Sequence, residues 1–323
     1  MLAITIGNFD GVHRGHAELV ARARSRAGSA GTVVAVTFEP HPVARLRPHS
    51  VPPRLTTARE RRQQLLEAGA SDVLELDPTP ELLALMPLEF VRALRARLPF
   101  DVIVEGHDFR FGHGRSGSIE TLRTFGRGFE AGEFAVEVVD LLDVALDDGT
   151  VVQASSSLVR WLLAQGRVRH ATSVLGRPYA VVAATAPGDR RGRTIGYPTL
   201  NLGNVETMMP ADGVYGGSAT LEDGRRFIAA ISVGTKPTFA RTLAGGIPQR
   251  TCEAHLLDAS LPLDWYGHVV RIEFETWIRE QVTFESLESL VARIAADVRE
   301  IRDRSQSRMS PRVRGVAFVE PVR

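Results

Sequence analysis

The chain of 323 residues contains one cysteine, carries a formal net charge of only +1, and has no apolar run long enough to cross a membrane. The single cysteine, Cys252, excludes an internal disulfide framework and a zinc site built from cysteines. A net charge near zero gives no overall attraction to nucleic acid. Met1 leads directly into the strand-like run at 2–6, so we expect no signal peptide. We therefore expect a cytoplasmic enzyme whose partners include neither a nucleic acid nor a membrane.

Lysine is almost absent as well. Of 39 lysines and arginines only Lys236 is a lysine, so 38 are arginines. Arginine makes better bidentate contacts with phosphate than lysine does, but a bias this broad reflects composition more than function. The apolar share of 44% and the mean hydropathy of −0.05 are ordinary for a globular protein, and the length has room for two domains.

The sequence GNFDGVHRGH at 7–16 joins the strand-like run 2–6 to a helix-like run at 17–27. A glycine-rich turn between a strand and a helix directs backbone N–H groups and a helix N-terminus at phosphate. His13 and His16, three residues apart, fall on one face of the first helical turn. No Gly-Lys-Ser/Thr follows, and the glycine spacing is not that of a dinucleotide fold. The pattern resembles the HxGH motif of nucleotidyltransferases. An ordinary turn with two surface histidines is the alternative, which the agreement of strand, turn and helix disfavours.

Class I aminoacyl-tRNA synthetases also carry an HxGH motif and form a second alternative. Their other signature is a loop of the Lys-Met-Ser-Lys-Ser type. A chain with a single lysine cannot contain such a loop, so this class is excluded.

The first half alternates strands and helices, the pattern of a doubly wound parallel sheet covered by helices. The expected strands are 2–6, 32–38, 72–76, 101–105 and 135–139, and the expected helices between them are 58–68, 88–98 and 118–125. In such sheets ligands bind beyond the C-terminal ends of the strands. The segments 37–42 and 106–112 follow predicted strands, so we expect them on the same rim as His13.

The pattern changes near 176–178, where helical runs at 156–165 and 168–175 end. Crowded strands separated by Gly, Pro and Asp follow, which is typical of a small antiparallel barrel. The expected strands are 179–186, 214–221, 227–233, 251–257 and 269–277, with a closing helix at 287–302. The predicted domains are therefore 1–176 and 177–304, and 305–323, without clear periodicity, is expected to be a mobile tail.

Together these motifs resemble the bacterial bifunctional riboflavin kinase/FAD synthetase family, from Ile4 to about Arg302. The first half is similar to the FMN adenylyltransferase module in GNFDGVHRGH, TFEPHP at 37–42, GHDFRFG at 106–112 and SSSLVR at 155–160. The resemblance implies a Rossmann-like domain in which the FMN phosphate attacks the α-phosphorus of ATP and pyrophosphate leaves. Positioning and charge stabilisation dominate such transfers.

The resemblance also implies roles for single residues of this half. His13 and His16 contact the ATP phosphates and, with Arg160, are the implied catalytic groups. Other implied ATP-binding positions are Gly7, Phe9, Asp10, Gly15 and Ser156. Asp108 and Phe111 border the flavin side of the cleft. Taken alone, each has a plainer explanation: the serines at 155–157 as a helix cap, Arg160 as one of many surface arginines, and Phe111 as a core residue.

The second half is similar to the riboflavin kinase module in GDRRGRTIGYPTLN at 188–201, PADGVY at 210–215, GTKPTF at 234–239 and EAHLLD at 253–258. The resemblance implies that Thr199 and Asn201, whose hard oxygens suit the ion, bind Mg²⁺ with the ATP phosphates. It implies that Glu253 accepts the proton of the riboflavin 5′-hydroxyl; an outward strand residue is the alternative. Implied ATP-binding positions are Gly188, Gly192, Arg193 and Gly196. We interpret His255 as structural.

Departures from the family pattern cluster in this second half. Leu200 replaces the usual alanine, which we expect to add bulk beside the two metal ligands, and Ala259 stands where an aromatic residue often follows. The chain also starts at its first strand, whereas relatives usually carry a short leader. Leu200 is therefore expected to tune the kinase site.

Three hypotheses remain from the sequence. The chain is a two-site enzyme that makes FMN from riboflavin and then FAD, an enzyme with one active half (most readily the adenylyltransferase), or a non-catalytic flavin-binding or regulatory paralogue. The intact Thr199, Asn201 and Glu253 argue against the third. The sequence leaves the oligomeric state open.

Overall fold

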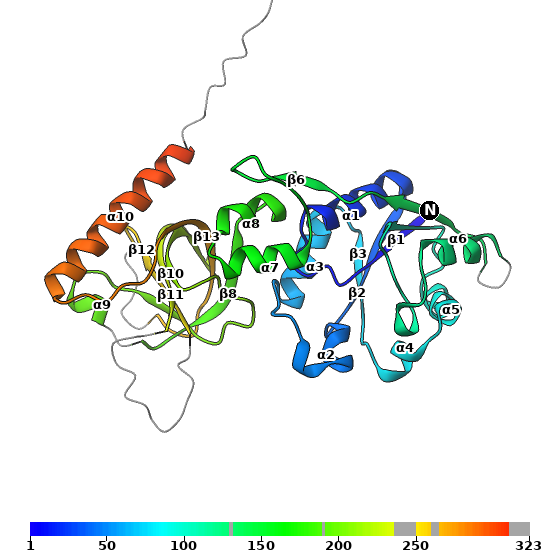
Figure 1. Ribbon diagram of the computed structural model, residues 1–323, viewed down its shortest axis with the longest axis horizontal. Helices are drawn as coiled ribbons and strands as arrows, with labels where there is room; N and C mark the ends of the chain where they lie inside the picture. Colours follow the sequence, from blue (N-terminus) through cyan, green and yellow to red (C-terminus); the bar gives the residue numbers. More distant parts are fainter. Residues whose placement is uncertain (129–131, 189–190, 236–249, 260–264, 310–323) are drawn as a thin grey trace, which may run out of the picture. The chain divides into compact units, whose positions relative to one another are not determined.

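The computed structural model describes residues 1–128, 132–188, 191–235, 250–259 and 265–309 (Figure 1). It contains two compact units. The N-terminal unit comprises Met1–Val181 together with Val205–Pro210, and the C-terminal unit comprises Val182–Asn204 and the chain from Ala211 onward. The sequence-based boundary at 176 lies five residues before this division, and the segment Val205–Pro210 was assigned to the other domain.

A five-stranded parallel sheet in the order β3-β2-β1-β4-β5 forms the centre of the N-terminal unit. Its strands are β1 (Leu2–Ile6), β2 (Thr32–Phe38), β3 (Asp72–Leu76), β4 (Val102–Gly106) and β5 (Ala135–Val139). The strand order reverses between β1 and β4, and ligands bind at such a switch point in doubly wound folds. The predicted α/β architecture is confirmed.

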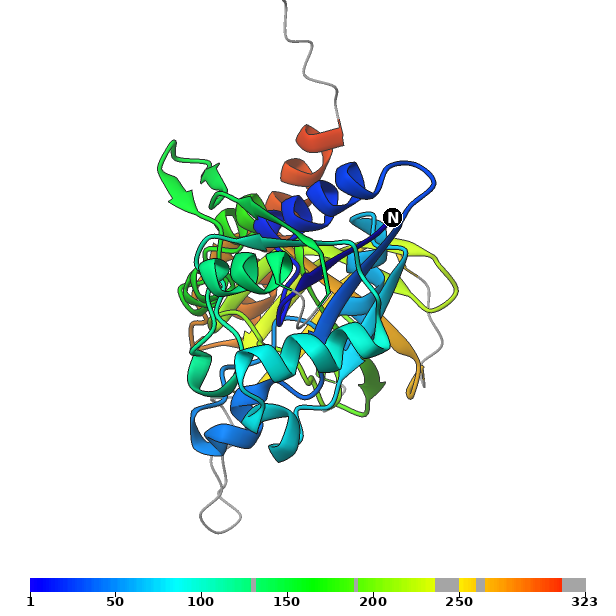
Figure 2. The same cartoon turned by 90° about the vertical axis from the view of Figure 1, so that its right-hand side faces the viewer.

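Helices cover both faces of this sheet. They are α1 (Arg14–Ala27), α3 (Ala58–Glu67), α5 (Pro87–Arg97) and α6 (Ile119–Arg127). In Figure 2 the strands drawn in blue lie between α1 and α5. Because side chains alternate along a strand, β1 contributes to two cores: Ala3 packs with Val20, and Ile4 packs with Phe90 and Leu122.

Short elements that the sequence does not predict complete the unit. These are α2 (Pro42–Leu46), η1 (Pro48–Ser50), α4 (Pro80–Ala84), η2 (His113–Arg115), and the ribbon of β6 (Asp143–Ala145) and β7 (Val151–Gln153). Elements of three to five residues are too short to show a period. The predicted pair α7 (Ser156–Ala164) and α8 (Val168–Leu175) follows, and Gly176 ends α8 in a left-handed conformation.

The C-terminal unit is a closed antiparallel barrel in the strand order β10-β11-β12-β9-β8-β13, as predicted. Its strands are β8 (Tyr179–Ala186), β9 (Leu200–Leu202), β10 (Gly213–Leu221), β11 (Arg226–Gly234), β12 (Thr251–Leu256) and β13 (Val269–Arg279). Sequence analysis missed β9 and the single helical turn α9 (Arg191–Thr194). Without β9 the sheet would not close, since β9 links β12 to β8.

The closing helix α10 (Leu287–Met309) is longer than predicted. The sequence placed its end at Arg302 and a tail from 305, but residues 305–309 are helical. Ile301 is buried, and Arg304 bonds both Glu300 and Thr276, so contacts continue past the predicted end. The rest of the predicted tail, 310–323, lies outside the described residues.

A fragment that starts at Leu175 should fold by itself, because it retains all six strands of the barrel. The expected result is a cooperative thermal transition by circular dichroism. The segment Val205–Pro210 packs in the N-terminal unit, where Met208 N donates to Arg54 O at 2.7 Å. The fragment loses that contact, so its transition should lie below that of the full chain. An unfolded fragment would contradict the predicted separability.

Candidate active sites

The loop between β1 and α1 is held in an unusual backbone conformation. Gly11 has φ +81°, and a Cβ there would lie 2.8 Å from Leu55 Cδ1. The neighbouring Phe9 and Val12, at φ 48° and 36°, also adopt the left-handed region that side chains disfavour. Both are almost fully buried. Packing therefore fixes a strained loop, a feature that clusters at functional sites.

His13 and His16 lie together at the N-terminus of α1. His13 is the N-cap, and its Nδ1 accepts the backbone N–H of His16 at 3.4 Å. The two rings stack with centroids 3.6 Å apart, and Phe9 meets the His16 ring edge-on at 5.1 Å. Because His13 Nδ1 accepts a hydrogen bond, the neutral ring carries its proton on Nε2. Sequence analysis placed both imidazoles on one face, and the structure does so too.

Both histidines are neutral at pH 7. Burial, with a contribution from Arg177, lowers the pKa of His13 to about 4. Burial, then His13 and Arg177, holds the pKa of His16 well below its usual value. His16 Nδ1 is buried without a hydrogen-bond partner among the described residues. The pair therefore offers N–H donors beside the positive end of a helix dipole, an arrangement suited to an anion.

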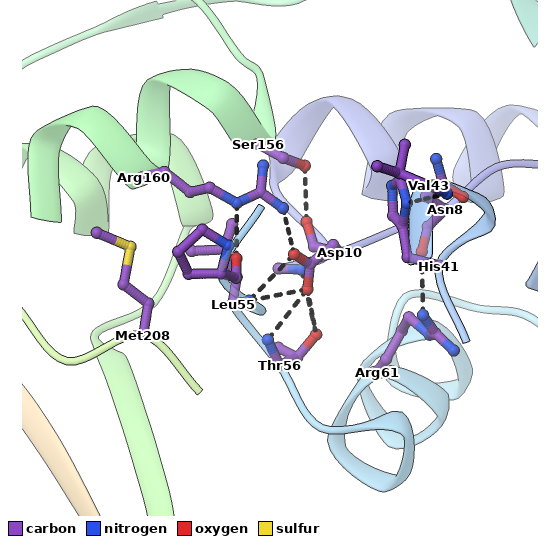
Figure 3. Close-up of polar contacts among 12 residues, drawn as sticks. Asn8, Asp10, His41, Val43, Leu55, Thr56, Arg61, Ser156, Arg160 and Met208 are labelled. Atoms are coloured by element: carbon purple, nitrogen blue, oxygen red, sulfur yellow. Dashed lines mark hydrogen bonds and ion pairs between the residues drawn. The ribbon is translucent and has the colours of Figure 1, made fainter. Parts of the chain in front are cut away.

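Asp10 is the centre of a second cluster (Figure 3). Its carboxylate accepts the backbone N–H groups of Leu55 and Thr56 at 3.0 and 3.1 Å. Arg160 Nη2 reaches the same carboxylate at 2.5 Å, and Ser156 Oγ donates to the backbone oxygen of Asp10 at 2.7 Å. The structure thus brings together Asp10, Ser156 and Arg160, which the sequence only places far apart.

These contacts limit what the cluster does. Arg160 also donates through Nε to Pro53 O at 2.8 Å, so both ends of its guanidinium have protein partners. Asp10 is buried. The geometry makes Asp10 and Arg160 anchors of the loop 7–16, and a direct contact of either with ATP stays a prediction.

The segment 37–42 lies beside this loop, as the sequence predicts for two strand ends on one rim. Thr37 Oγ1 donates to the backbone oxygen of Asn8 at 3.2 Å. Arg61 Nη1 donates to the same oxygen at 3.4 Å (Figure 3). Arg61 also pairs with Glu39 at 2.8 Å. His41 caps α2 through a bond from Val43 N at 3.1 Å. Arg61 is a buried residue of this rim that sequence analysis missed.

The segment 106–112 divides into an exposed and a buried part. Asp108 is exposed at the end of β4. Phe111 is buried. Its ring centroid lies 5.5 Å from that of Phe109, on which it stacks, and 6.1 Å from that of Phe90. Most of the Phe111 ring therefore packs in the core of the N-terminal unit. Its contact with flavin, and that of Asp108, stay predictions.

Glu105 is a second residue that sequence analysis missed. Its carboxyl is buried between β4 and β1 and accepts Ile6 N at 2.5 Å, beyond the last paired residues of the two strands. Burial raises the pKa of this carboxyl well above its usual value. The Glu105 carboxyl therefore supplies a hydrogen-bond acceptor for Ile6 N where β1 and β4 no longer pair.

The C-terminal unit contains a cavity of about 670 Å³ between the barrel and α10. Residues from the glycine-rich segment, the barrel strands and the chain after β13 line it, among them Tyr197, Thr199, Glu253, Arg279 and Phe284. The predicted base and one predicted metal ligand therefore face one space.

Strand register explains why these groups meet. Asn201 of β9 pairs with Glu253 of β12, and Thr199 Oγ1 donates to Glu253 Oε2 at 3.4 Å. Gly188 packs so closely on Asn201 that a Cβ would lie 2.2 Å from Asn201 Nδ2. A larger residue at 188 would displace the Asn201 side chain. The structure thus brings together Gly188, Thr199, Asn201 and Glu253.

The remaining glycines of this segment shape its turn. A Cβ at Gly192 would lie 2.2 Å from Tyr197 O, and Gly196 has φ +85°. Arg193 lies between them in α9 and is partly buried. Their contact with ATP stays a prediction. Lys236 of GTKPTF lies outside the described residues.

Leu200 does not crowd the predicted metal ligands. It pairs with Ala254, which is fully buried inside the barrel. Because side chains alternate along β9, Leu200 faces away from Asn201. The expectation that the bulk of Leu200 lies beside the metal ligands is therefore wrong. Leu200 is adjacent to them in sequence, but its place in β9 directs its side chain to the face of Ala254.

Leu200→Ala should therefore reduce stability and leave ATP use unchanged. The half-buried side chain contributes to the barrel interior, so its truncation should cost about 1–2 kcal/mol of unfolding free energy. The KM for ATP in FMN formation should stay within about twofold of the original value. Urea denaturation and initial rates measure the two quantities. A clearly lower KM would restore the crowding interpretation.

The cavity also holds an ion-paired cluster that no motif announced. Arg279, at the end of β13, binds Asp297 of α10 through Nε and Nη2 at 2.9 and 2.8 Å. Arg293 adds a contact of 3.0 Å to the same carboxylate. His255 Nδ1 lies 2.8 Å from Pro198 O, and His255 also lines the cavity, so its structural role stays a prediction. The sequence does not show that β13 and α10 lie close together, so it gives no signal for the pair Arg279 and Asp297.

Two negative findings concern the described residues. No group of three or more His, Cys, Asp or Glu side chains within them is arranged to hold a metal ion. Within the same residues, no helix combines the length and apolar character needed to span a membrane.

The fold and sites define a two-domain nucleotide-dependent transferase, with an HxGH loop in one domain and a glycine-rich segment over a barrel in the other. Two family models match in the same order: FAD synthetase over residues 1–153 and riboflavin kinase over 175–305. The chain belongs to the family of bifunctional riboflavin kinase/FMN adenylyltransferases, enzymes of FMN and FAD biosynthesis.

Similar proteins support this membership. The bifunctional riboflavin kinase/FMN adenylyltransferase of Escherichia coli K12 is 34% identical over 91% of this chain and 90% of the relative. The enzymes of Pseudomonas fluorescens and Bacillus subtilis are 36% and 32% identical over 91% and 92% of the chain, and 90% of each relative. A solved structure from Streptococcus pneumoniae, titled a macrolide-efflux protein, matches with a TM-score of 0.81 at 28% identity, covering 93% of both chains.

Proposed function

We propose that the loop 7–16 performs adenylyl transfer to FMN and that the barrel cavity phosphorylates riboflavin. The observation that carries the first assignment is the stacked pair of His13 and His16 at the N-terminus of α1. The second rests on Glu253 beside Thr199 in a cavity of flavin size. The proposal includes a cytoplasmic location. It also includes riboflavin, FMN and ATP as small-molecule partners, with neither a nucleic acid nor a membrane.

In the N-terminal unit, the protein contributes position and charge. An ATP phosphate at the end of α1 meets the helix N-terminus and the outward N–H of His13. Donors that are already oriented stabilise the charge that develops as pyrophosphate leaves, without reorganisation. Asp10, Arg160 and Ser156 keep the loop in place during transfer.

In the C-terminal unit, Glu253 accepts the proton of the riboflavin 5′-hydroxyl as the oxygen attacks the γ-phosphorus of ATP. Thr199 and Asn201 are the residues that would hold Mg²⁺. The neutral hydroxyl and carboxamide suit an ion that keeps several waters and binds phosphate oxygens as its other ligands. When bound, the ion neutralises charge on the β- and γ-phosphates.

One experiment tests both assignments. Pure protein is incubated with ATP, Mg²⁺ and either riboflavin or FMN, and the flavins are separated by chromatography. Conversion of riboflavin to FMN and then FAD supports two active sites. FAD from added FMN alone supports the one-site alternative, and binding without conversion supports the non-catalytic paralogue.

A further inference from the structure

The guanidinium of Arg177 binds the backbone of the HxGH loop. Nη2 donates to Gly11 O at 2.6 Å, and Nη1 donates to Val12 O at 2.9 Å. Nη1 also reaches Leu175 O at 3.3 Å, and Nη2 bonds Gln64 Oε1. Arg177 thereby crosslinks α3, α8 and the loop that ends in His13.

The position of Arg177 in the sequence gives no hint of this contact. It lies beyond the FAD synthetase match, which ends at 153, and inside the riboflavin kinase match, which starts at 175. The structure places it in the N-terminal unit, which continues to Val181. Gly176, in a left-handed conformation at φ 79°, ends α8 and turns the chain there.

We propose that Arg177 is a positioning residue for adenylyl transfer, which holds the carbonyls of Gly11 and Val12 so that His13 and His16 face the ATP phosphates. The proposal rests on the function proposed above for this loop. It assigns to the N-terminal reaction a residue that sequence matching places with the kinase.

The loop needs such a tether. Gly11 and Val12 have positive φ, and the carbonyl of Val12 belongs to the peptide that enters His13, the N-cap of α1. A rotated Val12–His13 peptide would turn the His13 ring away from His16. The planar guanidinium reaches both carbonyls at once, which an ammonium group does not match.

Arg177 also acts through its charge. It is the only charged group that lowers the pKa of His13, after burial, and it lowers the pKa of His16 together with His13. Apart from His13 itself, no other charged group among the described residues shifts either pKa. Burial is the larger cause of both lowered pKa values, and the Arg177 cation adds to it while it contributes positive potential where phosphate binds.

The test uses the full-length protein with Arg177→Met and Arg177→Lys. Arg169→Ala serves as the control, because Arg169 lies on α8 and pairs only at the surface with Asp147. FMN formation from riboflavin, measured in the same samples, reports on folding and on the barrel. FAD formation from FMN is measured as a function of pH.

For Arg177→Met, kcat/KM for FAD formation should fall about tenfold or more, as expected for misplaced catalytic groups. FMN formation should stay within about twofold. The acidic limb of the FAD profile should move to higher pH in Arg177→Met and stay in place in Arg177→Lys, which keeps the charge but loses one carbonyl.

Three results would overturn the proposal. They are unchanged FAD formation in Arg177→Met, an equal loss of both activities, or an acidic limb that does not move. A wild-type protein that forms FMN but no FAD would instead refute the function proposed for the loop, and the role of Arg177 with it.

Discussion

His16→Ala should abolish formation of FAD from FMN while FMN formation from riboflavin continues. His16 stacks on His13 at 3.6 Å and is held edge-on by Phe9 at the N-terminus of α1. Alanine removes one donor to the phosphates and the ring that keeps His13 in place. Loss of a single oriented donor lowers kcat by about 10²–10³, and loss of the stack should lower it further. Chromatography of both reactions measures the effect.

The matched control is His49→Ala, because His49 is an exposed histidine of η1. This variant should form FAD at the original rate. FAD formation by His16→Ala at more than a tenth of the wild-type rate would remove the histidine pair from the catalytic assignment.

Local pattern was enough to predict the loop around these histidines. The glycines, the apolar strand and the helix period are all contained in residues 2–27. The contacts that fix the loop are not local. Asp10 pairs with Arg160, and Gly11 with Arg177, across about half the chain. No periodicity in one sequence encodes a contact of that separation.

The sequence motifs also do not show which neighbours Phe111 and Arg160 contact in the fold. A motif suggests that Phe111 contacts flavin, but its ring fills the core with Phe90 and Phe109. Arg160 was expected at the phosphates, yet its guanidinium is bound to Asp10 and Pro53. Motif membership indicates that a residue belongs to the site, whereas packing decides whether it faces the ligand or supports those that do.

The barrel shows what strand register adds. Five of its strands were predicted from alternation and turn residues, but β9, with three residues, is too short for either signal. Its register with β12 sets Asn201 opposite Glu253 and turns Leu200 inward. The members of the predicted kinase site were therefore available from motifs, while their facing directions depended on a strand that the sequence did not reveal.

Glu253→Gln should lower kcat for FMN formation by about 10²-fold or more, the range typical of general acid–base catalysis. A primary alcohol is a poor nucleophile at neutral pH, so a carboxylate that accepts its proton assists the transfer. Glu253 faces the cavity, and Thr199 Oγ1 donates to it at 3.4 Å. Glutamine keeps the shape and this hydrogen bond but cannot take up a proton.

Because binding contacts survive in Glu253→Gln, flavin affinity and FAD formation from FMN should change little. Glu222→Gln is the matched control: Glu222 is exposed in the turn between β10 and β11, where it pairs with His268, and its replacement should leave kcat unchanged. Rapid-mix measurement of FMN formation at saturating ATP and riboflavin separates kcat from binding. If kcat of Glu253→Gln stays within a few-fold of the wild type, Glu253 only supports Thr199, and another group must accept the hydroxyl proton.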